Sequence, residues 1–434
     1  MSTAKSLKTD LKIAAPIAIV GMGITGEATL RLLQVLGYSR QDILTFDRSA
    51  GADIQDPQLL LQKNIRTMIV SPGVPLATDW IQKFRHDGGY LLSELSIAFA
   101  HLQNEKVIAI TGSLGKSTTT SMIGEGALSV DPHAFVGGNL GTPLAVYVAD
   151  VLESKRPRAQ YVILELSSYQ LENFPNLKSE VSVFTYLSPN HLERYPNLQS
   201  YYLTKLQLIE KTTGLIIANK KGGELVQKIP SSTPIPVVWA DQNDDLLKTE
   251  AFSVVNTVGA HNRDNLSLAA QVGNYFHWPT SAMKAMAEFH GLGHRLESCG
   301  RRRGSLFIND SKATTMDSVL QAVHSVLPEV AEGSKLHLML GGKDKNLPWE
   351  NLQILANIQK LSPLFFGACG ELARTKSGLR GPYYKTMTLA LEAIPTTLNA
   401  NDVVLLSPGG TSLDEFKNFE ERGNYFKNFV LSLK

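Results

Sequence analysis

Short apolar runs alternate with amphipathic stretches along nearly the whole chain of 434 residues. The runs are rich in Ile, Val and Leu, as in "IAAPIAIV", "YVILELSS" and "DVVLLSPGG". A continuous apolar run of roughly five to eight residues predicts a strand buried on both faces, and the amphipathic stretches predict helices that cover the sheet. The pattern therefore predicts an α/β protein built on mainly parallel sheets.

The order of these elements divides the chain into three blocks. Residues 1–103 begin with an apolar strand, a glycine turn and a helix, which predicts a Rossmann-like domain. Residues 104–297 begin with a second strand, glycine loop and helix, and residues 298–434 follow the glycine-bearing segment "GLGHRLE". At roughly 150 residues per domain, a chain of this length is expected to form about three domains.

Charge and composition narrow the class of partner. The 42 Lys and Arg residues nearly balance the 40 Asp and Glu residues, so a formal charge of +2 gives no reason to expect nucleic acid or a charged membrane as partner. No window reaches the roughly eighteen apolar residues of a membrane span. Cys299 and Cys369 show no CxxC spacing and fit a reducing compartment, so we expect a cytoplasmic protein that acts on small molecules.

The segment "TGSLGKSTTT" directly follows an apolar strand and begins a helix. Gly112 and Gly115 let backbone N–H groups turn toward an anion, and the helix N-terminus adds a positive dipole. Lys116 supplies a charge for terminal phosphate oxygens, while Ser117 or Thr118 can reach a phosphate-bound Mg²⁺. The spacing GxxGKS is shorter than the general GxxxxGKS, so a structural turn is the alternative, but the context favours phosphate binding.

A second glycine motif lies near the N-terminus. Gly21, Gly23 and Gly26 fit GxGxxG, and Asp47 closes the next strand, where a ribose-binding acid would lie. From this motif alone, binding of a dinucleotide, binding of another nucleotide's phosphates and tight packing of strand against helix are equal alternatives. A dehydrogenase would not explain the phosphate loop that follows.

Two further residues are candidate ligands for Mg²⁺. Glu165 lies at the C-terminal end of the run "YVILELSS", where parallel sheets place their ligands, and a hard carboxylate oxygen suits this metal. His191, in "SPNHLERYP", follows another strand end. The alternative for each is a structural polar group with satisfied hydrogen bonds.

Eight segments in this order carry a resemblance to a known family. They are "TGSLGKSTTT", "ELSSYQLE", "NHLERYP", "GAHNRDN", "GLGHRLE", "NDSKATT", "LGGKDKN" and "SPGGTSLDEFKNFEERG". The sequence resembles the Mur ligases of peptidoglycan synthesis from "GMGITG" to its C-terminus, and "ELSSYQLE", "NDSKATT" and "SLDEFKNFEERG" resemble the glutamate-adding branch of that family.

The resemblance implies a reaction and a domain plan. A Rossmann-like N-terminal domain would hold the UDP end of UDP-N-acetylmuramoyl-L-alanine, a central P-loop domain would bind ATP, and a C-terminal dinucleotide-fold-like domain would bring D-glutamate. ATP would activate the alanyl carboxylate as an acyl phosphate, and the glutamate amine would then attack it. The resemblance also implies a monomeric cytoplasmic ligase and assigns the GxGxxG motif to the UDP-sugar rather than to NAD.

The same resemblance implies roles for single residues near ATP. The ATP-binding set is Gly112, Ser113, Gly115, Lys116, Ser117, Thr118, Asn262, Asn265, Arg295, Asp310 and Lys312. Two Mg²⁺ ions would be held by Ser117, Glu165, His191 and Lys205. Catalysis would use Lys116, His191, Lys205 and Asn139, with Asn139 orienting the substrate carboxylate. Lys205 matches a family lysine that CO₂ carbamylates, although the helical stretch around it favours an ordinary surface lysine.

The two substrates have their own implied residues. The set for the UDP-substrate is Gly23, Ile24, Thr25, Asp47, Arg48, Ser71, Pro72, Gly73 and Asn139. The glutamate set is Thr314, Lys345, Ser412, Leu413 and Phe419, which combines a cation with hydroxyl and backbone donors for two carboxylates.

The sequence departs from the family pattern at three places. Ser113-Leu114 replaces the usual Thr-Asn or Ser-Asn, Asn190 replaces the usual Asp before the histidine, and Gly409-Gly410 replaces small alanines. These changes have two interpretations: they adjust the site locally, or they mark a protein that has lost its activity. A ligase for L-glutamate or another acidic amino acid, and a P-loop NTPase that joins no substrates, are the competing hypotheses for the function.

Overall fold

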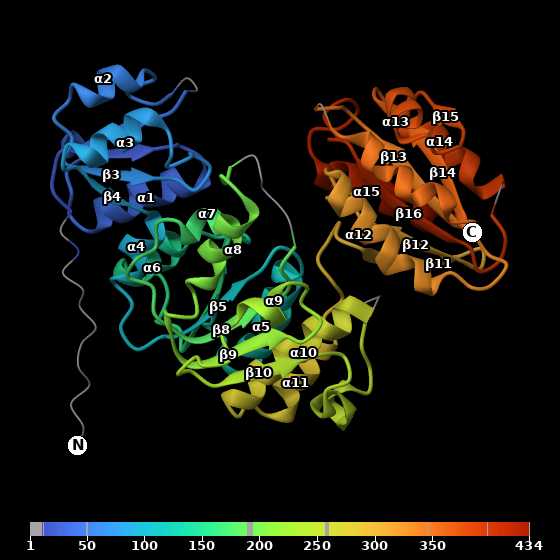
Figure 1. Ribbon diagram of the computed structural model, residues 1–434, viewed down its shortest axis with the longest axis horizontal. Helices are drawn as coiled ribbons and strands as arrows, with labels where there is room; N and C mark the ends of the chain where they lie inside the picture. The colour runs from blue at the N-terminus through green and yellow to red at the C-terminus, as the bar shows by residue number, and fades with distance from the viewer. Residues whose placement is uncertain are drawn as a thin grey trace. The chain divides into compact units, whose positions relative to one another are not determined.

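The computed structural model describes residues 11, 13–48, 51–188, 194–256, 260–345, 347–396 and 398–433. These residues form three sheets flanked by helices, which confirms the α/β class (Figure 1). Within these ranges, no helix combines the length and the apolar character that crossing a membrane requires.

The first sheet has four parallel strands in the order β2-β1-β3-β4. Its strands are β1 Ile17–Val20, β2 Ile43–Phe46, β3 Thr67–Val70 and β4 Tyr90–Leu92. The helices of this part are α1 Ile24–Val35, α2 Pro57–Leu61, α3 Asp79–His86 and α4 Glu94–Phe99, with a 3₁₀ turn at Arg40–Asp42. Ile17 and Ile19 pack into one hydrophobic cluster and Ala18 and Val20 into another, because successive side chains point to opposite faces. Both faces are covered, which explains a strand that is apolar throughout.

The central sheet has six parallel strands in the order β10-β9-β8-β5-β7-β6. Its strands are β5 Lys106–Thr111, β6 Phe135–Gly138, β7 Tyr161–Glu165, β8 Ser179–Phe184, β9 Thr212–Asn219 and β10 Val237–Ala240. The helices are α5 Lys116–Val130, α6 Leu144–Leu152, α7 Ser168–Leu171, α8 Leu198–Leu206, α9 Leu225–Lys228, α10 Ala260–Tyr275 and α11 Thr280–Ala287, with 3₁₀ turns at Asp245–Lys248 and Glu250–Phe252. Ile110 lies opposite Glu165, and Thr111 lies opposite Phe184. The register therefore brings the end of β5 beside the ends of β7 and β8.

The third sheet has six strands in the order β11-β12-β16-β13-β14-β15, all parallel except the β11–β12 pair. Its strands are β11 Glu297–Arg302, β12 Ser305–Asn309, β13 Leu336–Gly341, β14 Leu361–Phe366, β15 Tyr383–Tyr384 and β16 Val403–Gly409. The helices are α12 Met316–Val326, α13 Gly370–Ser377, α14 Met387–Ala393 and α15 Phe419–Ser432, with 3₁₀ turns at Leu327–Glu329, Trp349–Asn357 and Ile394–Thr396. Val319 of α12 and Ala373 of α13 pack on one face, and Leu391 of α14 and Phe426 of α15 pack on the other.

The chain divides into two compact units. One unit contains Met1–Ser253 with Asp264–Ala287, and the other contains Val254–Arg263 with Glu288–Lys434. The first and central sheets belong to the first unit, and the third sheet belongs to the second. The predicted division into residues 1–103, 104–297 and 298–434 stays a prediction.

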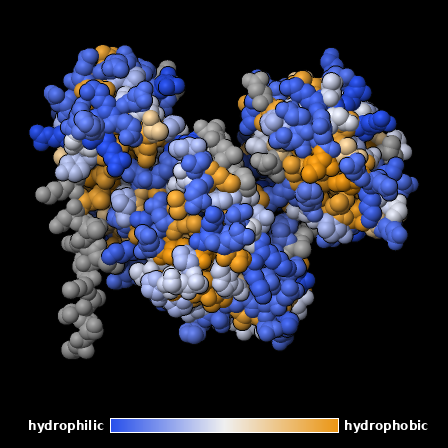
Figure 2. All heavy atoms as spheres, viewed as in Figure 1, coloured by the Kyte–Doolittle hydropathy of each residue, from blue (hydrophilic) through white to orange (hydrophobic). Residues whose placement is uncertain are grey.

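Within the first unit, the first and central sheets share one hydrophobic core. Ile17 of β1 and Val162 of β7 belong to the same buried cluster. Arg31 of α1 donates to Asp150 and Glu153 at the end of α6, forming ion pairs with both carboxylates. Outside the core, hydrophilic residues cover most of the face seen in Figure 2.

Glu94 adds a buried carboxyl group to the contact between these two sheets. It begins α4, is 4% exposed, and accepts a hydrogen bond from the backbone N–H of Ala145 in the first turn of α6. Removal from water outweighs this bond and raises the pKa of Glu94 from 4.5 to about 7. Because the folded state binds the proton more tightly, the group stabilises the fold fully below pH 4.5, and this contribution is lost as pH rises through 7.

We therefore expect Glu94→Gln to change the pH dependence of stability. Between pH 4.5 and pH 8, wild type should lose about 3 kcal/mol of unfolding free energy relative to the variant, at about 1.4 kcal/mol per pKa unit. Thermal unfolding of both proteins across this range measures the difference. Glu27→Gln, at an exposed position of α1, is the control. Parallel curves for wild type and Glu94→Gln would contradict the assignment.

Candidate functional site

The predicted glycine loop is a tight turn between β5 and α5. Gly112 has φ +150° and Gly115 has φ +83°, in the region that favours glycine. A Cβ added to Gly112 would lie 2.1 Å from Oγ1 of Thr185, and one added to Gly115 would lie 2.6 Å from Oδ1 of Asn265. Both glycines are therefore required by the backbone and by close neighbours, and the strand–loop–helix prediction is confirmed.

Ser113 anchors this loop to the segment that follows β8. Its backbone N–H donates to the carbonyl of Tyr186 (2.6 Å), and its Oγ donates to the carbonyl of Ser188 (2.8 Å). The same Oγ accepts from the Ser188 N–H and lies 2.9 Å from the hydroxyl of Tyr201. Ser113 is 6% exposed, so its side chain serves the shape of the loop in this structure.

Two lysines lie at the loop. Lys116, the first residue of α5, donates from Nζ to the carbonyl of Ser113 (3.1 Å). Lys205 comes from α8, is 1% exposed, and donates from Nζ to the carbonyl of Gly112 (2.8 Å). Burial lowers the pKa of Lys205 well below 10.5, the charge of Lys116 lowers it further, and Glu165 opposes the shift. A buried amine of lowered pKa is neutral often enough to act as a nucleophile.

Glu165 presents a carboxylate oxygen that lacks a partner. The residue is 1% exposed at the end of β7, and its Oε1 accepts from Nδ2 of Asn139 (2.7 Å). Its Oε2 is buried with no hydrogen-bond partner in the described part of the chain. Leaving such an oxygen unsatisfied is costly, and a hard cation is a fitting partner for it. The residues here therefore fit the predicted Mg²⁺ site.

The metal site is only partly within the described ranges. Ser117 is buried in the first turn of α5, close in sequence to the loop. His191 lies outside the described residues. Within those residues, no cluster of three or more His, Cys, Asp or Glu side chains could hold a metal ion. The hydroxyl of Ser117, the carboxylate of Glu165 and a carbamate on Lys205 remain the predicted ligands on residues that the structure describes.

Other predicted site residues lie around the same loop. Asn265 of α10 is 5% exposed, and its Oδ1 accepts from Oγ1 of Thr119 in α5 (3.2 Å). Thr118 is half-buried in the first turn of α5. Asn139 follows β6, and its backbone N–H donates to the carbonyl of Glu165 (2.8 Å). The structure thus brings Asn139, Glu165 and Lys205 to the edge of the sheet that carries the loop. Asn262, also in α10 but part of the second unit, is 8% exposed.

The GxGxxG segment forms a second loop, at the edge of the first sheet. Gly21 has φ +90°, and a Cβ on Gly26 would lie 2.1 Å from the Gly21 carbonyl oxygen, so the third glycine permits close packing of α1. The N–H of Met22 donates to Oδ2 of Asp47 (2.8 Å). Gly23 precedes the first turn of α1, with Ile24 exposed and Thr25 half-buried.

A pocket of about 400 Å³ lies beside this loop. Its lining includes the predicted residues Asp47, Arg48 and Gly73, together with Gly21 and Trp80. The remaining predicted residues of this set, Ser71 and Pro72, line a smaller neighbouring cavity. The Oγ of Ser71 donates to the Gly21 carbonyl (2.8 Å), which ties the two loops together.

The second unit carries the remaining predictions. Asp310 accepts from Oγ of Ser407 (2.8 Å) and from the Leu296 N–H (3.2 Å), and burial raises its pKa to about 7. Nζ of Lys312 lies 3.7 Å from the ring centroid of Phe419, a cation–π contact. Burial lowers the pKa of Lys312, and the nearby charge of Arg295, an exposed residue, adds to the effect.

Two loops that carry predicted glutamate-binding residues are joined by backbone hydrogen bonds. Lys343 and Thr411 exchange hydrogen bonds of 2.8 Å and 3.0 Å, which joins the segment of Lys345 to that of Ser412. Ser412 is 3% exposed and Leu413 is 60% exposed. Thr314 is half-buried and Lys345 is exposed.

The two glycines that replace alanines are held in close contacts. A Cβ on Gly410 would lie 2.5 Å from the Gly341 carbonyl oxygen. Gly409 has φ +75°, and a Cβ there would lie 2.8 Å from Cε of Met316. An alanine at either position would require a shift in this backbone.

Four residues that shape these loops were not predicted. Thr185 donates from Oγ1 to the Leu114 carbonyl, and Tyr201 contacts Ser113. Arg422 is fully buried and donates to Ser311 and to the Gly410 carbonyl, and Arg194 donates to the loop after β3. Arg194 and Arg422 lie within quoted motifs, but only the fold shows what each of the four side chains contacts.

Comparison with known proteins identifies similar chains. The Mur ligase middle domain family matches residues 110–257. A UDP-N-acetylmuramoylalanine--D-glutamate ligase of Buchnera aphidicola is 30% identical over 443 residues, which cover 95% of this chain and 97% of that protein. A protein of the same name from Pseudomonas syringae is 32% identical over 383 residues, covering 84% of this chain and 83% of that protein.

Two solved structures share the fold. The MurF ligase of Thermotoga maritima, in complex with ADP, superposes with a TM-score of 0.57 at 13% identity, covering 86% of this chain and 90% of that one. The UDP-N-acetylmuramate-alanine ligase of Thermotoga maritima gives a TM-score of 0.55 at 15% identity, covering 97% of this chain and 100% of that one.

The unpaired oxygen of Glu165 leads to a testable expectation. ATP with Mg²⁺ should raise the melting temperature of wild type above that seen with ATP alone, and Glu165→Gln should abolish this rise. A ligand at about one hundred times its dissociation constant stabilises the folded state by about 2.7 kcal/mol. Without Mg²⁺ the variant should be no less stable than wild type, because the change removes a buried carboxylate oxygen that lacks a hydrogen-bond partner. Differential scanning calorimetry with and without Mg²⁺ measures both effects.

Glu105→Gln is the matched control for this experiment. Glu105 is also buried in the first unit, but its carboxylate accepts from Tyr147, Arg158 and the Gln103 N–H. This control should lower stability and leave the Mg²⁺ response intact. A Glu165→Gln protein that keeps the full Mg²⁺ response would contradict the assignment of Glu165 as a ligand.

Proposed function

Since this chain belongs to the Mur ligase family, in the branch of the UDP-N-acetylmuramoylalanine--D-glutamate ligases, we propose that it joins D-glutamate to UDP-N-acetylmuramoyl-L-alanine. The reaction would convert ATP to ADP and phosphate in the cytoplasm, and the enzyme would act as a monomer. The observation that carries this proposal is the glycine loop beside the buried pair Lys205 and Glu165.

The chemistry explains why such a site is needed. A carboxylate is a poor electrophile, so its oxygen would first attack the γ-phosphorus of ATP, and ADP would leave. The resulting acyl phosphate has a good leaving group. The amine of D-glutamate would attack the carbonyl carbon, lose a proton, and expel phosphate together with one original carboxylate oxygen. Several anions meet in these steps, so the protein has to supply cationic and N–H donors and limit the access of water.

The residues of the first unit supply these functions. The backbone N–H groups of the loop and the ammonium of Lys116 would bind the phosphates of ATP. Glu165 and Ser117 would hold Mg²⁺, which when bound offsets the negative charge of the phosphates. His191 would hold a second Mg²⁺, and Asn139 would orient the substrate carboxylate, consistent with its hydrogen bond to Glu165.

Lys205 has a more specific proposed role. Its neutral amine would attack CO₂, form an N–C bond and release a proton, which converts the amine into a carbamate anion. The low exposure and lowered pKa of Lys205 support this step, because only the unprotonated amine reacts. The carbamate would then act as a further oxygen ligand for the cation held by Glu165.

The other substrate groups are assigned by the same proposal. The uridine end would occupy the pocket lined by Asp47 and Arg48, with the diphosphate near residues 23–25 and 71–73. Asn262, Asn265, Arg295, Asp310 and Lys312 would contact ATP. The two carboxylates of D-glutamate would bind to Lys345, Thr314, Ser412 and the backbone of Leu413, beside Phe419.

A direct test of the function uses purified protein with ATP, Mg²⁺, UDP-N-acetylmuramoyl-L-alanine and either enantiomer of glutamate. Mass spectrometry should detect the amide product with D-glutamate and one phosphate released for each product. Product formed only with L-glutamate would show a different specificity. Phosphate release that does not require the UDP-substrate would instead favour an NTPase that joins nothing.

The carbamate leads to a separate expectation for Lys205. Lys205→Ala should reduce ligation by at least about a thousandfold, since it removes a metal ligand from the reacting centre. Acetate or another small carboxylate should partly restore activity by occupying the space that the carbamate would fill. Initial rates with and without added acetate measure the rescue. Full activity of Lys205→Ala without any additive would contradict the role.

A further inference from the structure

We propose that Arg194 is a positioning residue that fixes the UDP-substrate loop relative to the metal and phosphate site. This inference rests on the proposed function and goes beyond it, because none of the site residues assigned above explains how the two ends of one substrate are held in register. The substrate would reach from the pocket beside Asp47 to the carboxylate near Glu165, so the spacing of these two regions decides whether that carboxylate meets ATP.

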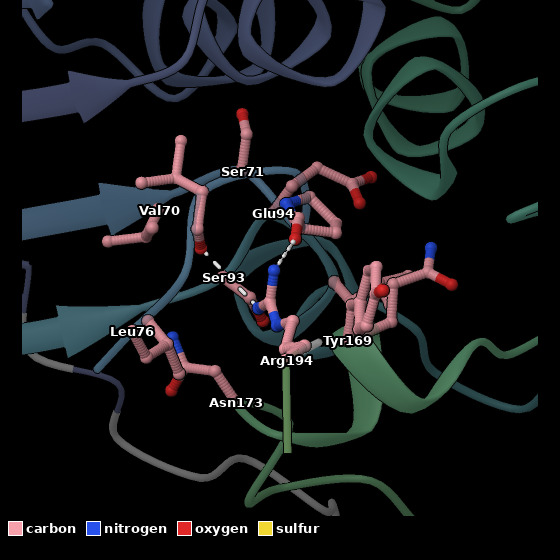
Figure 3. Close-up of a pocket in the computed structure, with 12 residues that line it drawn as sticks. Val70, Ser71, Leu76, Ser93, Glu94, Tyr169, Asn173 and Arg194 are labelled. Carbon is pink, nitrogen blue, oxygen red and sulfur yellow. Dashed lines mark hydrogen bonds between the residues drawn. The ribbon is translucent and has the colours of Figure 1, made fainter. Parts of the chain in front are cut away.

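The Arg194 guanidinium contacts the UDP-substrate loop through two of its nitrogen atoms. Its Nη1 donates to the carbonyl of Pro72 (3.0 Å) and its Nη2 donates to the carbonyl of Val74 (3.4 Å). These two carbonyls flank Gly73 in the loop that follows β3, where the UDP-substrate is predicted to bind. Figure 3 shows the Arg194 side chain directed toward this loop, with Tyr169 beside it.

The same guanidinium is also held by α7, the helix that follows β7 of the central sheet. Nε and Nη2 donate to the two carboxylate oxygens of Glu172 at 3.2 Å and 2.7 Å, a bidentate ion pair. The guanidinium carbon lies 4.0 Å from the ring centroid of Tyr169. The Arg194 side chain is 9% exposed, so water competes little for these donors.

The elements that hold Arg194 lead directly to the predicted metal ligand. Tyr169 lies in α7 and Glu172 caps its end, and α7 begins only three residues after Glu165. A capping box fixes the start of this helix, since Ser167 accepts from the Gln170 N–H and the Gln170 side chain accepts from the Ser167 N–H. A short, rigid path therefore connects Glu165 to the loop at Gly73. In sequence, Arg194 also follows the predicted ligand His191 by three residues.

The dimensions of the surrounding space indicate an indirect role. The cavity lined by Arg194, Ser71, Glu94 and Tyr169 measures about 10 Å³, roughly the room of one water molecule. Val74 lines both this cavity and the larger pocket of about 400 Å³ that holds Asp47 and Arg48. Arg194 therefore supports the wall of the larger pocket from behind and is too enclosed to bind the substrate itself.

Two substitutions of Arg194 test this role against a purely structural one. Arg194→Met removes the whole network, and Arg194→Lys keeps the charge but cannot reproduce the planar fork. We expect both to lower kcat/KM for UDP-N-acetylmuramoyl-L-alanine by about 100-fold, the size expected from a misplacement of about 1 Å. More than one ATP should be hydrolysed per amide formed, whereas affinity for ATP measured without the UDP-substrate should stay within about twofold of wild type.

Arg31→Met is the matched control. Arg31 also joins the first and central parts of this unit, from α1 to α6, through an ion-paired guanidinium, but its partners Asp150 and Glu153 line neither of the two pockets beside Gly73. This control should lower the melting temperature while kcat/KM and the ratio of ATP to product stay near wild type. Glu172→Gln, which removes the charge that orients Arg194, supplies the same comparison should Arg194→Met fail to fold.

The possible results separate the hypotheses. Wild-type protein that forms no product would refute the proposed function itself. With an active wild type, the inference is overturned by an Arg194→Lys protein with wild-type kcat/KM and coupling, which would show that charge alone suffices. It is equally overturned if the Arg194 and Glu172 variants lose kcat/KM and coupling only in proportion to their fall in melting temperature, with the same proportion as in Arg31→Met. A loss of kcat/KM and coupling beyond that of the control supports it.

Discussion

The site depends on one buried amine that is held against the backbone of the glycine loop. Lys205 donates to the Gly112 carbonyl from a side chain that is 1% exposed. Keeping a full charge there would be costly, so burial and the neighbouring Lys116 favour the neutral form. Glu165 places a negative charge nearby that opposes this shift, and one of its oxygens lacks a hydrogen-bond partner in the described part of the chain. In the proposed function, the phosphates of ATP and Mg²⁺ would complete this site.

The parallel sheet creates this arrangement. β5 lies between β7 and β8, so the strands deliver the glycine loop, Glu165 and Thr185 to one edge. Thr185 and Ser113 then fix the shape of the loop by hydrogen bonds from their side chains. The same edge is linked through α7 and Arg194 to the loop after β3 in the first sheet. Substrate binding and phosphoryl transfer would thus share one rigid framework within the first unit.

The sequence predicts the local parts of this framework better than the long-range ones. The apolar strand and the glycines at 112 and 115 determine a strand–loop–helix unit by themselves, and the structure confirms it. Lys205 is different, because the residues around it predict an ordinary surface lysine and only the packing of α8 under the loop buries it. Thr185, Tyr201 and Arg194 escaped prediction for the same reason, since their partners lie on elements distant in the sequence. His191 stays a prediction outside the described residues.

The most direct test of the account follows the oxygen atoms of the substrate. UDP-N-acetylmuramoyl-L-alanine labelled with ¹⁸O in both oxygens of its alanyl carboxylate should transfer one labelled oxygen to the phosphate released in each turnover. This result is required if the carboxylate attacks the γ-phosphorus and the amine later expels phosphate. Mass spectrometry of the phosphate distinguishes the outcomes. Amide product accompanied by unlabelled phosphate would show that the carboxylate is never phosphorylated, which would contradict the central claim.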